Sequence, residues 1–195
     1  MSDSSHAGGA ANGDWFEITN TGDTSLSLAG YYWDDDGPAG NDGAFFPSIS
    51  ILPSESLVIV SESTANLPTF VSAWGGGFTA VSEDSFTGPD TFSGLSGNGD
   101  QIQIWDSDPN AGPATLITSV FFGEATTGSS FEWATGGTPL GLSVDGENGA
   151  FVATEDGAGG AGTDIGSPGI AVAVPEPSTL LLGATGLLAL LRRRR

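Results

Sequence analysis

The run Leu57-Val58-Ile59-Val60 decides the fold class of this chain. Four consecutive apolar residues, three of them β-branched, are typical of a strand that is buried on both faces. Leu52-Pro53-Ser54-Glu55 predicts a turn before it. Further short strands are expected at 14–19, 26–33, 45–51, 101–105, 116–122, 131–133 and 150–153. About eight short strands separated by turns favour an all-β fold, arranged as a β-sandwich.

One segment of the folded region, Ser63 to Trp74, predicts a short helix. Its apolar residues recur at helical spacing, namely Leu67, Phe70, Val71 and Trp74. Ser63 or Thr64 is expected to cap its start, and Pro68 is compatible only with its first turn. The glycines at 75–77 are expected to end it, and 78–92 reads as a loop with scattered aromatic residues.

Charge is distributed very unevenly along the chain. The 195 residues hold 24 acidic and 4 basic side chains, for a net charge of −20. The four basic residues are Arg192, Arg193, Arg194 and Arg195, and only Glu176 of the acidic residues lies near them, which leaves 23 in residues 1–174. A region without cations repels nucleic acid, so nucleic-acid binding is not expected. The composition suits a salty or calcium-bearing medium.

Catalytic chemistry finds little support in the residues. The single histidine, His6, lies in a Gly/Ser-rich stretch, and no Gly-x-Ser-x-Gly sequence is present. No cysteine is available as a nucleophile or metal ligand, and no local pattern singles out a pair of carboxylates for glycoside hydrolysis. We therefore expect a protein that is not an enzyme and carries no cofactor.

Two acidic stretches are candidate calcium sites. Asp106, Asp108 and Asn110 place oxygen ligands at alternate positions, as a calcium loop begins. The pattern then departs from such a loop, because Ala111 and Ile117 stand where a glycine and a bidentate glutamate are expected. The second stretch is Asp34-Asp35-Asp36. For both, a solvated turn with local backbone bonding is the alternative to weak calcium binding.

Seven large aromatic side chains allow two interpretations: Trp15, Tyr31, Tyr32, Trp33, Trp74, Trp105 and Trp133. Aromatic residues stack on sugar rings when they share an exposed face. They also fill the core of a β-sandwich when they alternate along its strands, and core packing is the interpretation that we favour.

The C-terminus combines three unlike elements. Pro175-Glu176-Pro177 precedes an uncharged segment from Leu180 to Leu191, and the basic cluster Arg192, Arg193, Arg194 and Arg195 follows. The leucines of the uncharged segment are Leu180, Leu181, Leu182, Leu187, Leu188, Leu190 and Leu191. As a helix it would span about 18 Å at ~1.5 Å per residue, which is short for a bilayer core. It predicts a marginal transmembrane helix whose arginines stay in the cytoplasm, so that residues 1–174 face the periplasm or the exterior.

This C-terminal segment resembles the PEP-CTERM sorting signal of Gram-negative bacteria. The resemblance implies recognition by an exosortase, a membrane transpeptidase, with processing near Pro175, Glu176 and Pro177. It also implies a protein of the cell surface or of an extracellular matrix that contains exopolysaccharide. A helix buried in a soluble domain is the alternative, and Gly183 and Gly186 disfavour it.

The remainder resembles the lamin-tail family, which has an immunoglobulin-like sandwich fold. The resemblance rests on 14–22 with 26–31, on Leu52-Pro53 before 57–60, on 97–100 before 102–104, and on Ser167-Pro168-Gly169. It implies a domain over 14–156, between a flexible segment 1–13 and a Gly/Asp-rich linker 157–173, with the sorting signal at 174–195. The family opens with a strand that is missing here, so we expect that strand and a signal peptide upstream of Met1.

Together these features predict an exported surface or matrix protein, without enzymatic activity, that an exosortase sorts and processes. Two alternatives remain open. One is a module that binds the exopolysaccharide matrix through calcium or through glycans. The other is a surface protein that stays permanently anchored in the membrane.

Overall fold

The computed structural model of the chain describes residues 1, 13–35, 43–88, 94–154 and 162–171. These residues are mostly β with one short helix, which confirms the all-β prediction. The elements in chain order are β1 (Trp15–Thr19), β2 (Leu26–Ser27), β3 (Tyr32–Asp34), β4 (Ala44–Phe45), β5 (Ser50–Ile51), β6 (Ser56–Val60), α1 (Leu67–Ala73), β7 (Thr79–Ser82), the 3-10 turn η1 (Glu83–Ser85), β8 (Asp100–Trp105), β9 (Leu116–Phe122), β10 (Phe131–Trp133), β11 (Pro139–Leu142), β12 (Phe151–Val152) and β13 (Ile165–Gly166).

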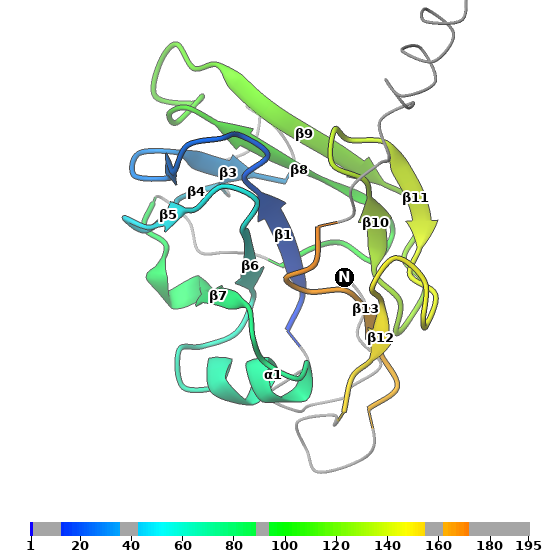
Figure 1. Ribbon diagram of the computed structural model, residues 1–195. Helices are drawn as coiled ribbons and strands as arrows, with labels where there is room; N and C mark the ends of the chain where they lie inside the picture. The colour runs from blue at the N-terminus through cyan, green and yellow to red at the C-terminus, as the bar shows by residue number, and fades with distance from the viewer. Residues whose placement is uncertain (2–12, 36–42, 89–93, 155–161, 172–195) are drawn as a thin grey trace, which may run out of the picture.

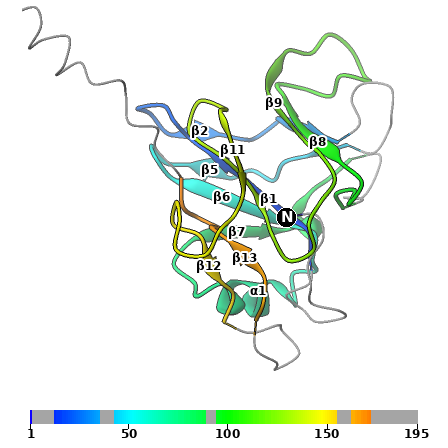
Figure 2. The same cartoon turned by 90° about the vertical axis from the view of Figure 1, so that its right-hand side faces the viewer.

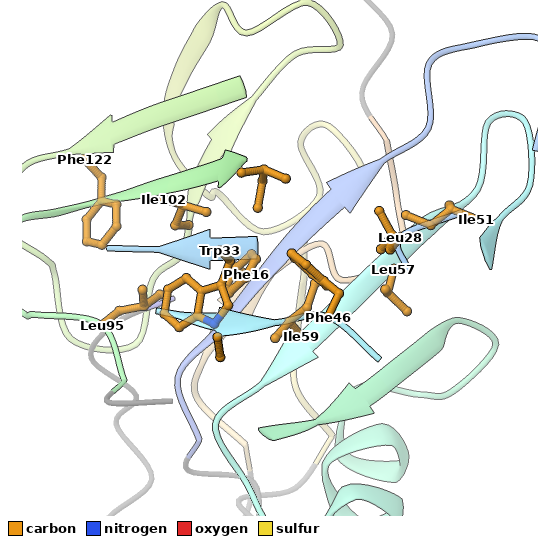
Figure 3. Close-up of a cluster of buried hydrophobic side chains, with 12 residues drawn as sticks. Phe16, Leu28, Trp33, Phe46, Ile51, Leu57, Ile59, Leu95, Ile102 and Phe122 are labelled. Atoms are coloured by element: carbon orange, nitrogen blue, oxygen red, sulfur yellow. The ribbon is translucent and has the colours of Figure 1, made fainter. Parts of the chain in front are cut away.

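Two sheets form the body of the fold. One has the strand order β1-β6-β7 and the other the order β4-β3-β8-β9. Side chains from both sheets meet in one buried cluster, drawn in Figure 3, in which Phe16 of β1 lies against Trp33 of β3 with ring centroids 5.2 Å apart. The pairs β10-β11 and β12-β13 lie together on one side of the molecule, beside β1 (Figures 1 and 2).

The burial of β6 on both of its faces explains why its sequence is continuously apolar. Leu57 and Ile59 point into the cluster between the two sheets, whereas Val58 and Val60 join a second buried cluster with α1. All four side chains are at most 1 % exposed. A strand covered on both faces has no position for a polar side chain, so the buried strand expected at 57–60 is confirmed.

The helix α1 connects β6 to β7, and these two strands are parallel (Figure 1). Pro68 lies in its first turn as expected, but the expected cap at Ser63 or Thr64 is wrong: the N-cap is Asn66, which makes no side-chain capping bond. Gly75, which has a positive φ of 76°, follows the helix as predicted. The loop expected at 78–92 is wrong for β7. This strand runs parallel to β6, and parallel neighbours need a long crossover between them, which α1 supplies.

Several strands differ from the sequence expectations. The strand expected at 45–51 is interrupted after Phe45, because Pro47 cannot donate a ladder hydrogen bond. Its two ends, β4 and β5, pair with β3 and β2 respectively, in different sheets. The strands β11 and β13 have no counterpart among the expected strands, and β13 lies within the stretch 157–173 for which a linker was expected.

The membrane prediction concerns a different part of the chain. Over the residues that the structure describes, no helix is long and apolar enough to cross a membrane. The apolar segment at 180–191 and the processing residues 175–177 lie outside the described residues. The same holds for the basic cluster, which consists of Arg192, Arg193, Arg194 and Arg195. The transmembrane helix and its cytoplasmic arginines therefore stay predictions.

Candidate functional site

The candidate calcium site at Asp34-Asp35-Asp36 does not begin as a solvated turn. Asp34 is the last residue of β3 and pairs with Gln103 of β8, and its side chain is fully buried. Asp35 is only 7 % exposed, and Asp36 lies outside the described residues. The interpretation of this stretch as solvated is therefore wrong for Asp34 and Asp35, because pairing with β8 carries the strand into the acidic run.

The candidate calcium site at Asp106, Asp108 and Asn110 uses its oxygens to stabilise its own loop. Asp106 Oδ1 accepts a hydrogen bond from Thr115 N at 2.7 Å and one from Ser107 Oγ at 3.1 Å. Asp108 Oδ1 accepts one from Asn110 N at 2.8 Å. The bond from the Thr115 backbone holds the pKa of Asp106 below its ordinary value. These bonds hold together the loop between β8 and β9 in the way that Asp and Asn commonly do in turns.

Metal ligands are not gathered elsewhere in the described ranges. Across 13–35, 43–88, 94–154 and 162–171, no three acidic or histidine side chains lie close enough to hold a metal ion together. Calcium binding stays a prediction for both stretches, and His6 lies outside the described residues.

None of the seven aromatic side chains that could stack on sugars is exposed. Four are buried, namely Trp15, Tyr32, Trp33 and Trp74, and the other three are partly buried. Trp15 packs edge-on against Phe70 and Trp74, with ring centroids 6.5 and 5.8 Å away. This packing agrees with the interpretation of these aromatic side chains as core residues.

A cavity of about 800 Å³ lies between β1 and β9, which are the end strands of the two sheets. Phe16 and Ile18 line it from β1, Val120 from β9, and Phe131 and Trp133 from β10. The turn at 167–171 completes the lining. No local sequence pattern could have indicated this cavity, because its walls come from segments more than 100 residues apart in the chain.

A partly buried carboxylate ties β1 to the end of the described domain. Glu17 Oε2 accepts a hydrogen bond from the Gly169 backbone N–H, which lies 152 residues away in sequence. Burial raises the pKa of Glu17, while the bonds from Gly169 and from the Ser56 side chain act in the opposite direction. The net direction means that desolvation of the carboxylate outweighs its hydrogen bonds.

Gly169 itself fits where no other residue would. Its φ is +81°, which L-residues rarely adopt, and an added Cβ would lie 3.0 Å from Phe78 Cγ and closer still to Phe78 Cβ. Ile165 N donates to Gly128 O at 2.8 Å, and Ser130 N donates to Ile165 O at 3.0 Å. The segment 162–171 is therefore part of the packed domain.

The N-terminal residue of the described domain is also buried. The Met1 amine donates a hydrogen bond to Trp15 O at 2.6 Å, and Trp15 N donates to Met1 O at 3.0 Å. This reciprocal pair extends the ladder on the edge of β1 away from β6. Burial lowers the pKa of the Met1 amine from 8.0 to about 5, and the nearby carboxylates Asp14 and Asp164 only partly oppose this.

Comparison with known proteins identifies the C-terminal segment. Residues 173–195 match the family model of the PEP-CTERM protein-sorting motif. The predicted sorting signal is thereby confirmed, and the motif indicates exosortase-dependent sorting of an exported protein that associates transiently with the membrane. No curated protein and no solved structure matches the chain.

The matched range contains every sorting element that the sequence singled out. It begins just before the proline motif and runs to the last residue of the chain. It therefore includes Pro175, Glu176, Pro177, Arg192, Arg193, Arg194 and Arg195.

Proposed function

We propose that this chain is a non-enzymatic protein of the cell surface or extracellular matrix, which an exosortase processes near Pro175, Glu176 and Pro177. The observation that carries the proposal is the PEP-CTERM motif at 173–195, directly after a packed domain that reaches residue 171. The motif supports export and sorting, and the acidic domain is the part that reaches the destination.

The short connection between domain and motif determines where the domain is held before processing. Nine Cα–Cα steps separate Ala171 from Leu180, where the apolar segment begins, and these span at most ~32 Å when fully extended. Because 162–171 is packed against β1 and β12, it adds no slack to this connection. We therefore expect the domain to stay within about 32 Å of the membrane surface until the tail is removed.

Charge favours release once the tail is removed. All basic residues of the chain lie at 192–195, and residues 1–174 contain none. An anionic domain is repelled by anionic lipid headgroups, whereas the arginines attract them and hold the segment in its orientation. Cleavage ahead of the apolar segment removes both the segment and the arginines, so the processed domain should leave the membrane without further assistance.

We also propose that the two facing sheets belong to an immunoglobulin-like sandwich of the lamin-tail type. The shared core of β1, β3, β6 and β8 supports this assignment. The parallel pairing of β6 with β7 across α1 departs from a purely antiparallel sandwich. Such a domain offers a stable scaffold, and its fold alone does not specify a ligand.

The cavity favours a second candidate function, binding of a glycan or another small ligand of the matrix. Its volume of about 800 Å³ lies within the range of small-molecule sites, and Phe131 and Trp133 supply partly exposed aromatic surface. A glycan array probed with and without calcium tests this function. Binding that Trp133→Ala abolishes would favour a binding module, and no binding under either condition would leave the scaffold role.

The sorting proposal is tested in cells that produce an exosortase and in matched cells that lack it. We expect the domain in the surface or extracellular fraction only when the exosortase is present. Replacing Pro175 and Pro177 with alanine should leave the chain in the membrane fraction, whereas replacing Pro38 and Pro47 provides a control with the same number of changes. Equal surface delivery of the chain in both strains would refute the proposal.

A further inference from the structure

Four exposed aliphatic side chains lie close to the point where the described domain ends. They form what we call the exit face, which consists of Leu140, Leu142, Val144 and Ile170, each between 38 and 51 % exposed. Ile170 packs against the loop that follows β11, since a Cβ added at Gly149 would lie 2.8 Å from Ile170 Cγ2. That loop begins at Val144, whose C=O accepts a hydrogen bond from Glu147 N at 2.9 Å. Figure 2 shows the end of the described chain, in orange, beside this loop.

The pairing of β11 explains why its leucines are exposed. Among the described residues, β11 pairs with β10 alone. The register shifts beside Trp133, which leaves Leu140 without a partner in β10, and Gly141 next to it has a φ of +105°. A bulge of this kind bends a strand locally. Ser143 by contrast is buried, with its Oγ 2.6 Å from Ser130 Oγ, and it anchors the hairpin to the domain.

The exit face has no charged side chain of its own. The chain holds 24 acidic residues, yet residues 133–144 contain none. Glu132, just before this range, is buried and accepts a hydrogen bond from Asn148 Nδ2 at 3.1 Å. Asp145 and Glu147, just after it, are exposed at the border. Exposed apolar residues with a polar rim are typical of surfaces that contact a protein or a membrane.

The position of the exit face selects the membrane as its partner. Ile170 is followed directly by Ala171, and the sorting motif, which associates transiently with the membrane, begins at residue 173. The tether of nine residues described above gives the surface around its attachment point a high local concentration at the bilayer. Phe131 and Trp133 of the neighbouring strand β10 are partly exposed aromatic residues, a class that is enriched where proteins meet lipid headgroups.

We propose that the exit face rests on the bilayer surface while the domain is still joined to its C-terminal segment. This inference rests on the proposed sorting function and adds which side of the domain the membrane covers. Because residues 1–174 contain no cation, the contact depends on apolar burial, and Asp145 and Glu147 keep it shallow. Anionic lipid should therefore weaken it. After cleavage the contact loses its tether, and four side chains alone do not hold the domain.

Quenching by lipid tests this contact, because the chain contains no cysteine and can be labelled at a single site. The full chain with Leu142→Cys carries an environment-sensitive fluorophore and is reconstituted into phosphatidylcholine vesicles with or without a nitroxide-labelled lipid. The matched control is Leu52→Cys, an exposed leucine that follows β5, on the opposite side of the molecule from β11 in Figure 1. We expect the nitroxide lipid to reduce the fluorescence at position 142 and to leave that at position 52 unchanged.

Two further labels make the result decisive. Leu188→Cys reports whether the apolar segment enters the vesicles. Quenching at 188 without quenching at 142 would overturn the exit face and leave the sorting proposal standing, whereas no quenching at either position would contradict both. Phe121 of β9 is 73 % exposed, and equal quenching of Phe121→Cys would overturn the choice of face. A shift of the emission at 142 to shorter wavelength without quenching would mean that protein, such as a second copy, covers it, and would also overturn the proposal.

Charge variants test whether apolar burial holds the contact. With the label on Val144→Cys, the pair Leu140→Glu and Leu142→Glu should abolish quenching, whereas Leu52→Glu should preserve it. These side chains are exposed, so circular dichroism should show the same melting transition for each variant. Quenching of the label in the otherwise unchanged chain should fall as phosphatidylglycerol replaces phosphatidylcholine. Quenching that survives both glutamates, or that rises with anionic lipid, would contradict the proposal.

Discussion

Replacing Gly169 with alanine tests whether the domain is packed as far as the sorting motif. The φ of +81° is unfavourable for an L-residue by about 1–2 kcal/mol. The new methyl group would also collide with Phe78, and overpacking of this kind costs about 1–3 kcal/mol. We therefore expect the free energy that holds 162–171 in its packed position to fall by about 2–5 kcal/mol. The loss cannot exceed the whole of that free energy.

Hydrogen exchange measures this loss of local stability at the residues where it occurs. At about 1.4 kcal/mol per factor of ten, amides of 162–171 should exchange about 30- to 4,000-fold faster in Gly169→Ala. The Ile165 and Gly169 amides are suitable reporters, because both donate hydrogen bonds to the body of the domain. Strands β6 and β8 should keep their protection until the whole domain unfolds.

Gly146 provides a matched control for the backbone effect. It has the same φ of +81°, but an added Cβ would meet no atom within 4 Å. Gly146→Ala should therefore lose only the conformational part, about 1–2 kcal/mol. Equal losses for the two variants, or unchanged exchange at 162–171 in Gly169→Ala, would refute the packing described for this segment.

Three further predictions concern ionisable groups. Burial raises the pKa of Glu17, so the contribution of this carboxyl group to stability falls as the pH rises past the ordinary pKa of a glutamate. Glu17→Gln should therefore be at least as stable as wild type at neutral pH, measured by urea midpoints. In a chain that is produced with Met1 as its first residue, the pKa of the Met1 amine is lowered to about 5, so the unfolded chain binds more protons and stability should rise between about pH 5 and 8. That rise is at most about 4 kcal/mol, and acetylation of Met1 should remove it in the same urea titration. The pKa of Asp106 is lowered by its bond from Thr115, so Asp106→Asn should lower the Tm at neutral pH but not in strong acid, where the carboxyl is protonated.

The strands that the sequence predicted are those whose environment is encoded locally. β6 is apolar at four consecutive positions because both of its faces are covered, and β8 alternates because Ile102 and Ile104 alone enter the core. The helix was recognisable for the same reason, since Phe70 and Trp74 recur at the spacing that buries one face.

Elements that depend on distant partners were not predictable in this way. β7 is only four residues long, and what makes it a strand is parallel pairing with β6. β13 lies in a Gly-rich stretch, and its position depends on β12 and on Ser130. Asp34 reads as part of an acidic turn, but pairing with Gln103 of β8 keeps it in the sheet.

The candidate sites differ in the same way, because one is encoded in a contiguous segment and the other depends on distant segments. The sorting signal was predictable because its proline motif, apolar segment and arginines all lie within the contiguous range 173–195. The cavity was not, because its lining joins β1 to β10 and to 167–171.

The mass of the mature protein tests the central claim most directly. The protein is recovered from the surface or medium of an exosortase-producing cell, and its intact mass is measured. A C-terminus near Pro175, Glu176 and Pro177, with the arginines at 192–195 absent, is the result that exosortase processing predicts. A mature chain that still carries the four arginines would contradict it.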